Sequence, residues 1–74
     1  MKIEVVGHEH YAFEHGHRPR GRGGWLFSPE NPYERNSRYM ERLSPAFSGT
    51  FTEATRAAKV WAAERGYAEV WVCP

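Results

Sequence analysis

The clearest helical pattern in the sequence is Thr50-Phe51-Thr52-Glu53-Ala54-Thr55-Arg56-Ala57-Ala58-Lys59-Val60-Trp61-Ala62-Ala63-Glu64-Arg65, and Gly66 follows it. Its small and apolar positions recur every three or four residues, as on a helix with one buried face; they are Ala54, Ala57, Ala58, Trp61 and Ala62. Thr50 and Glu53 have the spacing of a capping box, with Thr52 as a competing cap. Gly66 is typical of a residue that ends a helix. The sequence therefore predicts a helix over 51–65, lying close against a sheet.

Segments on both sides of this helix have the composition of strands. After it, residues 67–73 alternate, with Val70 and Val72 on one face and Trp71 on the other. At the start of the chain, residues 2–14 alternate in the same way and place Ile3 and Phe13 on one face. We therefore predict a strand over 67–73 and one long strand over 2–14, bulged near its glycine.

The middle of the chain is less regular. Residues 15–24 contain four glycines and a proline, so they are predicted to form an arginine- and glycine-rich hairpin loop. Residues 25–28 then return as a short strand. Residues 29–49 are predicted to be irregular or partly helical, with Asn31 as a candidate helix cap.

These elements predict one α+β domain over 1–74, with the element order ββαβ. The simplest arrangement is a three-stranded antiparallel or mixed sheet in the order 2-1-3. The first strand lies at its centre, the last strand is antiparallel to it, and the main helix covers one face. The other face, which carries Val6 and Trp71, has no predicted cover and is a candidate for binding a partner.

Two parts of the chain resemble small uncharacterised phage and bacterial proteins. One runs from Gly49-Thr50-Phe51-Thr52-Glu53-Ala54 through Val70-Trp71-Val72, a threonine-capped, alanine-rich helix followed by a terminal strand. The other is Arg20-Gly21-Arg22-Gly23-Gly24-Trp25. The resemblance covers about half of the chain and implies a ββαβ fold and an accessory role. It brings no catalytic residues.

Composition limits the classes of function. Ten basic and nine acidic residues give a formal charge of +1, so the chain lacks the strongly basic balance typical of nucleic-acid-binding proteins. Cys73 is the single cysteine, which excludes an internal disulfide. No signal peptide or membrane span is predicted, and the expected location is the cytoplasm. Eleven aromatic residues are more than one helix and three strands readily cover, which favours a homodimer.

The predicted binding site is the arginine loop with the aromatic residue that follows it. Arg18, Arg20 and Arg22 place three guanidinium groups on a backbone with little steric cover, and Trp25 could stack a base. Three interpretations stay open. The loop could bind an acidic protein surface or the phosphates of a nucleic acid. It could also be solvated, with its arginines paired to Glu9, Glu14 or Glu30.

Metal binding and catalysis have weaker support. The low-ranked metal candidates are His8, His10, His15 and His17; on a strand, the first two would point to the same side. Their spacing matches no zinc signature, and we predict no metal and no cofactor. Cys73 sits at the end of the chain, away from a base, and a domain this small struggles to enclose a pocket of ~300 Å³. The sequence therefore predicts a non-enzymatic protein that binds a protein partner or itself, without membrane association. The alternatives are nucleic-acid binding through the loop arginines and metal binding through the histidines.

Overall fold

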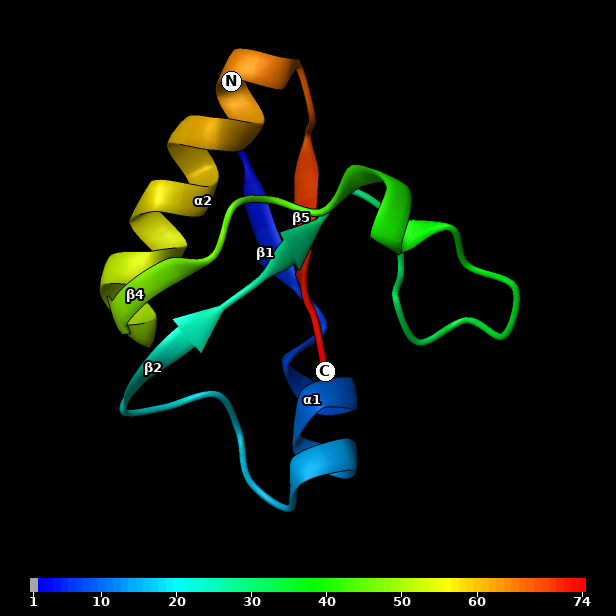
Figure 1. Cartoon of the computed structure of the whole chain (residues 1–74), viewed down its shortest axis with the longest axis vertical. Coiled ribbons are helices and arrows are strands. Elements are labelled where there is room, and N and C mark those ends of the chain that lie inside the picture. Colours follow the sequence, from blue (N-terminus) through cyan, green and yellow to red (C-terminus); the bar gives the residue numbers. More distant parts are fainter. Residues whose placement is uncertain (1) are drawn as a thin grey trace.

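The alanine-rich helix occupies the predicted residues. A computed structural model describes residues 2–74, and in it α2 spans Phe51–Arg65 (Figure 1). Ala54, Ala58 and Ala62 are buried, and Ala57 and Trp61 lie half-buried at the border of that face. Small side chains spaced four apart let the helix backbone approach the strands closely.

Thr50 is the residue that caps α2. Its Oγ1 accepts a hydrogen bond from the Glu53 backbone N–H at 3.1 Å, and Glu53 Oε1 accepts one from the Thr50 N–H at 3.0 Å. A Cβ on Gly49, whose φ is +121°, would lie 3.0 Å from Glu53 Oε1, so this glycine leaves room for the capping carboxylate. Gly66 ends the helix in the left-handed conformation, as predicted.

Replacing Thr50 by alanine should lower the melting temperature by about 4–8 °C, because an N-cap contributes about 1 kcal/mol in a domain of this size. Thr52→Ala is the matched control. Thr52 is exposed, and the cap bond belongs to Thr50, so its loss should shift the transition far less. Thermal unfolding of both variants followed by circular dichroism would compare them, and equal shifts would contradict the assignment.

The three-stranded sheet differs from the predicted one in order and direction. Its order is β1-β5-β3, with β5 (Glu69–Val72) at the centre, parallel to β1 (Glu4–Val6) and antiparallel to β3 (Phe27–Ser28). The predicted order 2-1-3, with an antiparallel last strand, is wrong. The chain between β1 and β3 does not form a hairpin that would place β3 beside β1. Both β1 and β3 pair with β5 instead. The last strand also begins later than predicted, because the Tyr67 N–H donates to Ala62 O in the helix end.

The predicted strand over 2–14 is wrong beyond its first residues. β1 ends at Val6, and α1 (His8–His15) follows it. Gly7 adopts a φ of +93° and turns the chain, and Gly16 ends the helix with its N–H bonded to Ala12 O. A left-handed backbone favours glycine. Gly7 and Gly16 therefore mark the two ends of a helix whose eight residues include no glycine or proline. The alternating pattern was therefore not a sign of a strand.

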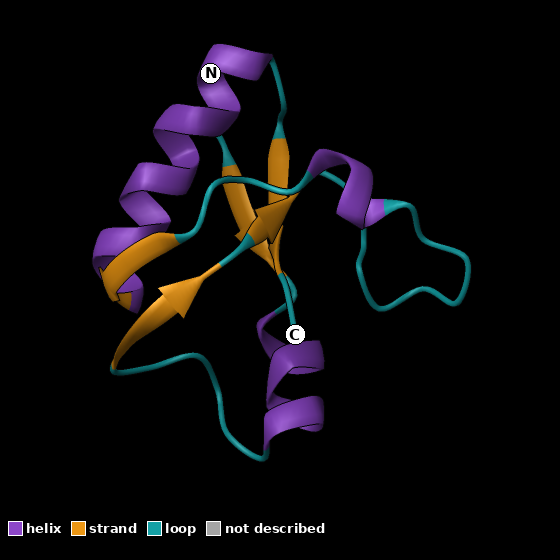
Figure 2. Cartoon of the chain, in the orientation of Figure 1, coloured by secondary structure: helices purple, strands orange, loops and turns teal. Residues whose placement is uncertain are grey.

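The second predicted strand, 25–28, is divided between two sheets. β2 (Arg22–Trp25) pairs antiparallel with β4 (Phe47–Thr50), and β3 pairs with β5 (Figure 2). Trp25 and Phe27 both enter the core, and Leu26 between them is partly exposed. The loop predicted over 15–24 is consequently shorter, because its first residue belongs to α1 and its last three to β2. The architecture is still α+β.

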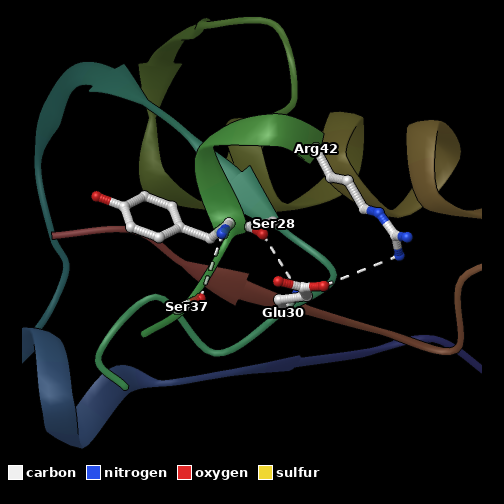
Figure 3. Close-up of polar contacts among 5 residues, drawn as sticks. Ser28, Glu30, Ser37 and Arg42 are labelled. Carbon is white, nitrogen blue, oxygen red and sulfur yellow. Dashed lines mark hydrogen bonds and ion pairs between the residues drawn. The ribbon is translucent and has the colours of Figure 1, made fainter. Parts of the chain in front are cut away.

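Residues 29–46 are a loop with one short helical turn, η1 (Tyr39–Arg42), and β4 after it was not predicted. Asn31 does not cap a helix; its Oδ1 accepts a hydrogen bond from the Tyr33 N–H in a turn. Figure 3 shows the local contacts: the Glu30 N–H donates to Ser28 Oγ, the Tyr39 N–H donates to Ser37 Oγ, and Arg42 lies 4.0 Å from Glu30. In this segment, short polar side chains thus accept the backbone hydrogen bonds that a helix or sheet would otherwise provide for.

Ser44 closes the outer edge of β3. Its Oγ accepts a hydrogen bond from the Phe27 N–H at 2.9 Å, and its own N–H donates to Phe27 O at 2.8 Å. The core then lies between α2 and the two sheets. Within residues 2–74, its main cluster of buried side chains is formed by Ile3, Trp25, Phe27, Ala54, Ala58, Ala62, Val70 and Val72. In the part of the chain described, residues 2–74, no helix has the length and apolar character needed to cross a membrane.

Candidate binding surface around helix α1

Helix α1 stands at the lower end of the sheet in Figure 1, and none of its residues is buried. Tyr11 attaches it to the core: its ring lies 6.0 Å from the Trp25 ring and is stacked on His15 at 4.1 Å. Gly7 sets the angle of the helix, because a Cβ there would lie 3.0 Å from Trp71. The helix is therefore held by aromatic contacts of three of its side chains and by one tight turn, although none of its residues is buried.

Two open grooves flank α1. We call the first the Tyr33 groove; it has a volume of about 330 Å³ and is lined by Glu9, His10, Phe13, Glu14 and Tyr33. The second, the Trp71 groove, has a volume of about 320 Å³. Its lining includes Val6, Gly7, His8, Arg18 and Trp71. Both are larger than the size that such a small domain was expected to enclose, but both are open to solvent.

The Trp71 groove lies on the sheet face that was predicted to be open. Val6 and Trp71 are half-buried on the side away from α2, and the His10 ring meets the Trp71 ring edge-on at 5.9 Å. Tyr33 covers another part of this face, and its hydroxyl donates a hydrogen bond to Val72 O at 2.7 Å. Burial raises the pKa of this phenol, so it stays protonated and keeps donating at neutral pH.

The four histidines all pack against aromatic rings. His8 meets Phe51 edge-on, His10 stacks on Tyr33 at 5.0 Å, and Tyr11 contacts both His15 and His17. The expectation that His8 and His10 point to the same side is wrong, because positions two apart on a helix lie on different faces. Burial, and then the charge of Arg18, lower the pKa of His8. Among residues 2–74, no three His, Cys, Asp or Glu side chains converge as metal ligands would.

The arginine loop is as exposed as its composition suggested. Arg18, Arg20 and Arg22 are exposed, and no carboxylate of residues 2–74 lies within ion-pair distance of any of them. The predicted pairing of this loop with Glu9, Glu14 or Glu30 is therefore wrong for all three residues of the described chain, and Glu30 pairs with Arg42 instead. Arg22 opens β2 and helps to lower the pKa of Glu53, although the hydrogen bonds from Thr50 contribute most of that shift.

Trp25 has a different environment from the arginines. It is 6% exposed, its Nε1 donates to Gly49 O at 3.2 Å, and its ring contacts Phe51. A ring enclosed in this way offers no face to a base, so the loop has its three guanidinium groups without the adjacent stacking platform. Trp71 is the tryptophan that shares a groove with Arg18.

Sequence reasoning missed Phe13. The alternating pattern placed it beside Ile3 on the buried face of a strand, whereas on α1 it is 90% exposed. The signal that could have found it is the pair Gly7 and Gly16, which bound a helix in which Tyr11 and Phe13 point in different directions.

Cys73 does not have the surroundings of a nucleophile. It is buried, and burial raises the pKa of its thiol to about 12, so the thiolate is scarce at neutral pH.

No family model, no curated protein and no solved structure matches this chain. The resemblance to small phage and bacterial proteins therefore stays a prediction.

Proposed function

We infer that this chain is a non-enzymatic binding protein whose arginine loop docks on an acidic surface of a protein partner. The loop comprises residues 16–21, together with Arg22 at the start of β2. The observation that carries this proposal is the state of Arg18, Arg20 and Arg22, three exposed guanidinium groups with no carboxylate of residues 2–74 in contact. A guanidinium group forms paired hydrogen bonds with a carboxylate, so a partner carboxylate would find donors already free.

The surroundings of the loop favour a protein partner. An exposed aromatic side chain, Phe13, precedes the loop by a few residues, and aromatic residues with arginine are the types enriched at protein interfaces. Glu9 and Glu14 lie exposed on the helix that leads into the loop, so the basic surface is confined to the loop and lacks the extended basic field that usually supports nucleic-acid binding. Burial of Cys73 and the open shape of both grooves support a binding role over a catalytic one.

Nucleic-acid binding is the second candidate, and one observation favours it. Arg18 and the half-buried Trp71 line the same groove, so a phosphate on the guanidinium group would place a base near an indole ring. The loop arginines would then follow the phosphates, and Trp71 would take the stacking role first assigned to Trp25.

A comparison of two polyanions tests both candidates. Binding of poly-L-glutamate and of oligothymidylate would be measured by fluorescence anisotropy between ~50 and ~300 mM salt, for the natural chain and for the variant R18A/R20A/R22A. We expect binding to poly-L-glutamate that the triple variant loses. On oligothymidylate, three phosphate contacts would give a log-log salt slope of about −2, at about −0.7 for each phosphate.

The matched control is R35A/K59A/R56A, which also removes three exposed cations but leaves the loop intact. It should bind like the natural chain, because the effect depends on position and not on net charge alone. A slope near −2 on oligothymidylate that only the loop variant abolishes would favour the nucleic-acid candidate. No binding to either polymer would mean that the loop is solvated and the proposal is wrong.

A further inference from the structure

The Tyr33 groove combines aromatic rings with carboxylates. Phe13 is 90% exposed on α1, and Tyr33 reaches the groove from the loop 29–46, so its two main rings come from separate segments. The orientation of the Tyr33 ring is fixed, because its hydroxyl donates to Val72 O at 2.7 Å and the His10 ring stacks on it at 5.0 Å. The faces of phenylalanine and tyrosine rings carry partial negative charge, which attracts cations.

Glu9 and Glu14 add full negative charges to this groove. Glu9 lies four positions before Phe13 on α1 and is its neighbour on the helix surface, and Glu14 follows it; both line the groove. Both are exposed, and neither has an ion-pair partner among residues 2–74. Burial is the largest cause of the raised pKa of Tyr33, and the charge of Glu14 adds to it, so the negative potential of this carboxylate reaches the ring. The groove therefore favours a positively charged occupant.

The shape and chemistry of the groove favour one kind of cation. The groove is open to solvent, and its volume of about 330 Å³ leaves room for a small organic group. A primary ammonium group is strongly hydrated and gains little from an exposed carboxylate. A quaternary ammonium group has no N–H to donate to water, and its methyl groups can contact ring faces directly. A metal ion is disfavoured, because no three ligand side chains converge in residues 2–74.

We propose that the Tyr33 groove binds a quaternary ammonium group, whose methyl groups contact the aromatic rings and whose charge is balanced by the two carboxylates. Choline and a trimethylated lysine side chain both carry this group. The site does not use the arginine loop, so it is independent of the proposed function. Arg18 lines the neighbouring Trp71 groove together with Glu9 and His10, and its positive charge opposes binding of a cation.

Titration with choline tests the proposal. Amide NMR signals of α1 and of Tyr33 should shift and saturate with a dissociation constant on the order of 1 mM, because an open site offers only a few cation–π contacts. Dimethylbutanol with a neopentyl group, which has the shape of choline without its charge, should bind about fivefold more weakly or less. A buffer of pH ~8 is chosen because a protonated imidazole would add a positive charge to the groove.

Two variants test the ring and the charge separately. Phe13→Leu keeps an apolar side chain but removes the ring, and Glu14→Gln keeps the shape but removes the charge; each should weaken choline binding about threefold or more. Glu64→Gln is the matched control for the charge, because Glu64 is exposed on α2 and does not line the groove; it should bind like the natural chain. All three positions are exposed, and the NMR spectra report whether each variant is folded.

The natural chain overturns the proposal if it does not bind choline or if it binds the neutral analogue equally well. A Phe13→Leu variant with unchanged affinity would also contradict it. Peptides with and without a trimethylated lysine identify the source of the group. Tighter binding of the methylated peptide than of choline assigns the site to a protein partner, and binding of choline alone assigns it to a small amine.

The loop variant R18A/R20A/R22A separates this inference from the proposed function. It should bind choline at least as tightly as the natural chain, because it removes positive charge beside Glu9. Loss of choline binding in this folded variant would place the site at the loop and overturn this inference alone. If the natural chain binds choline but not poly-L-glutamate, the acidic-surface function fails and this inference stands.

Discussion

Ala58→Asp should unfold the protein. The Ala58 side chain is 0% exposed in the middle of α2, on the face packed against the sheets. Burying a carboxylate that has no partner costs several kcal/mol, and a domain of this size is stabilised by only about 5 kcal/mol. We expect the helical circular dichroism signal to be lost at 25 °C, or the thermal transition to fall by tens of degrees.

Val60→Asp is the matched control for this variant. Val60 is two positions along the same helix and 61% exposed, and valine and aspartate have similar helix propensities. The control should therefore melt within a few degrees of the natural chain. Equal effects at both positions would mean that destabilisation comes from helix propensity and not from burial, and would contradict the packing of α2.

Gly7→Val should have the second largest effect. Gly7 has a φ of +93°, and a Cβ there would lie 3.0 Å from Trp71 Cε3 and 3.5 Å from Tyr33. A left-handed backbone costs a residue with a side chain about 1–2 kcal/mol, and crowding a packed position costs a further ~1–3 kcal/mol. The variant should thus lose about 2–5 kcal/mol of unfolding free energy in a urea titration.

Gly24→Val is the matched control. It separates the loss of stability caused by disturbing the turn at Gly7 from any general effect of replacing a glycine by valine. Gly24 lies in β2 without a positive φ, and a Cβ there would meet no atom within 4 Å. Valine is favoured in strands, so this control should be neutral or slightly stabilising. A Gly7→Val protein as stable as the natural chain would show that the turn between β1 and α1 can adopt another shape.

The candidate binding residues were predictable in part. The exposure of Arg18, Arg20 and Arg22 follows from the glycines and proline around them, which keep a charged segment outside regular packing. The burial of Trp25 does not follow from its neighbours, because it depends on Phe51 and Gly49, far along the chain. Phe13 was placed on the same strand face as Ile3 for a similar reason: its position depends on where the chain turns, and the left-handed turn at Gly7 determines that.

Helix α2, its cap at Thr50 and its end at Gly66 follow from local sequence alone, because the hydrogen bonds and caps of a helix join residues at most a few positions apart. Strand pairing, in contrast, depends on tertiary contacts. β5 aligns Val70 with Val5 and Val72 with Phe27, and β2 pairs with a strand that its composition did not predict. Which strands pair depends on packing between segments that are far apart in the sequence. The hydrophobic periodicity within one segment contains no information about its partner.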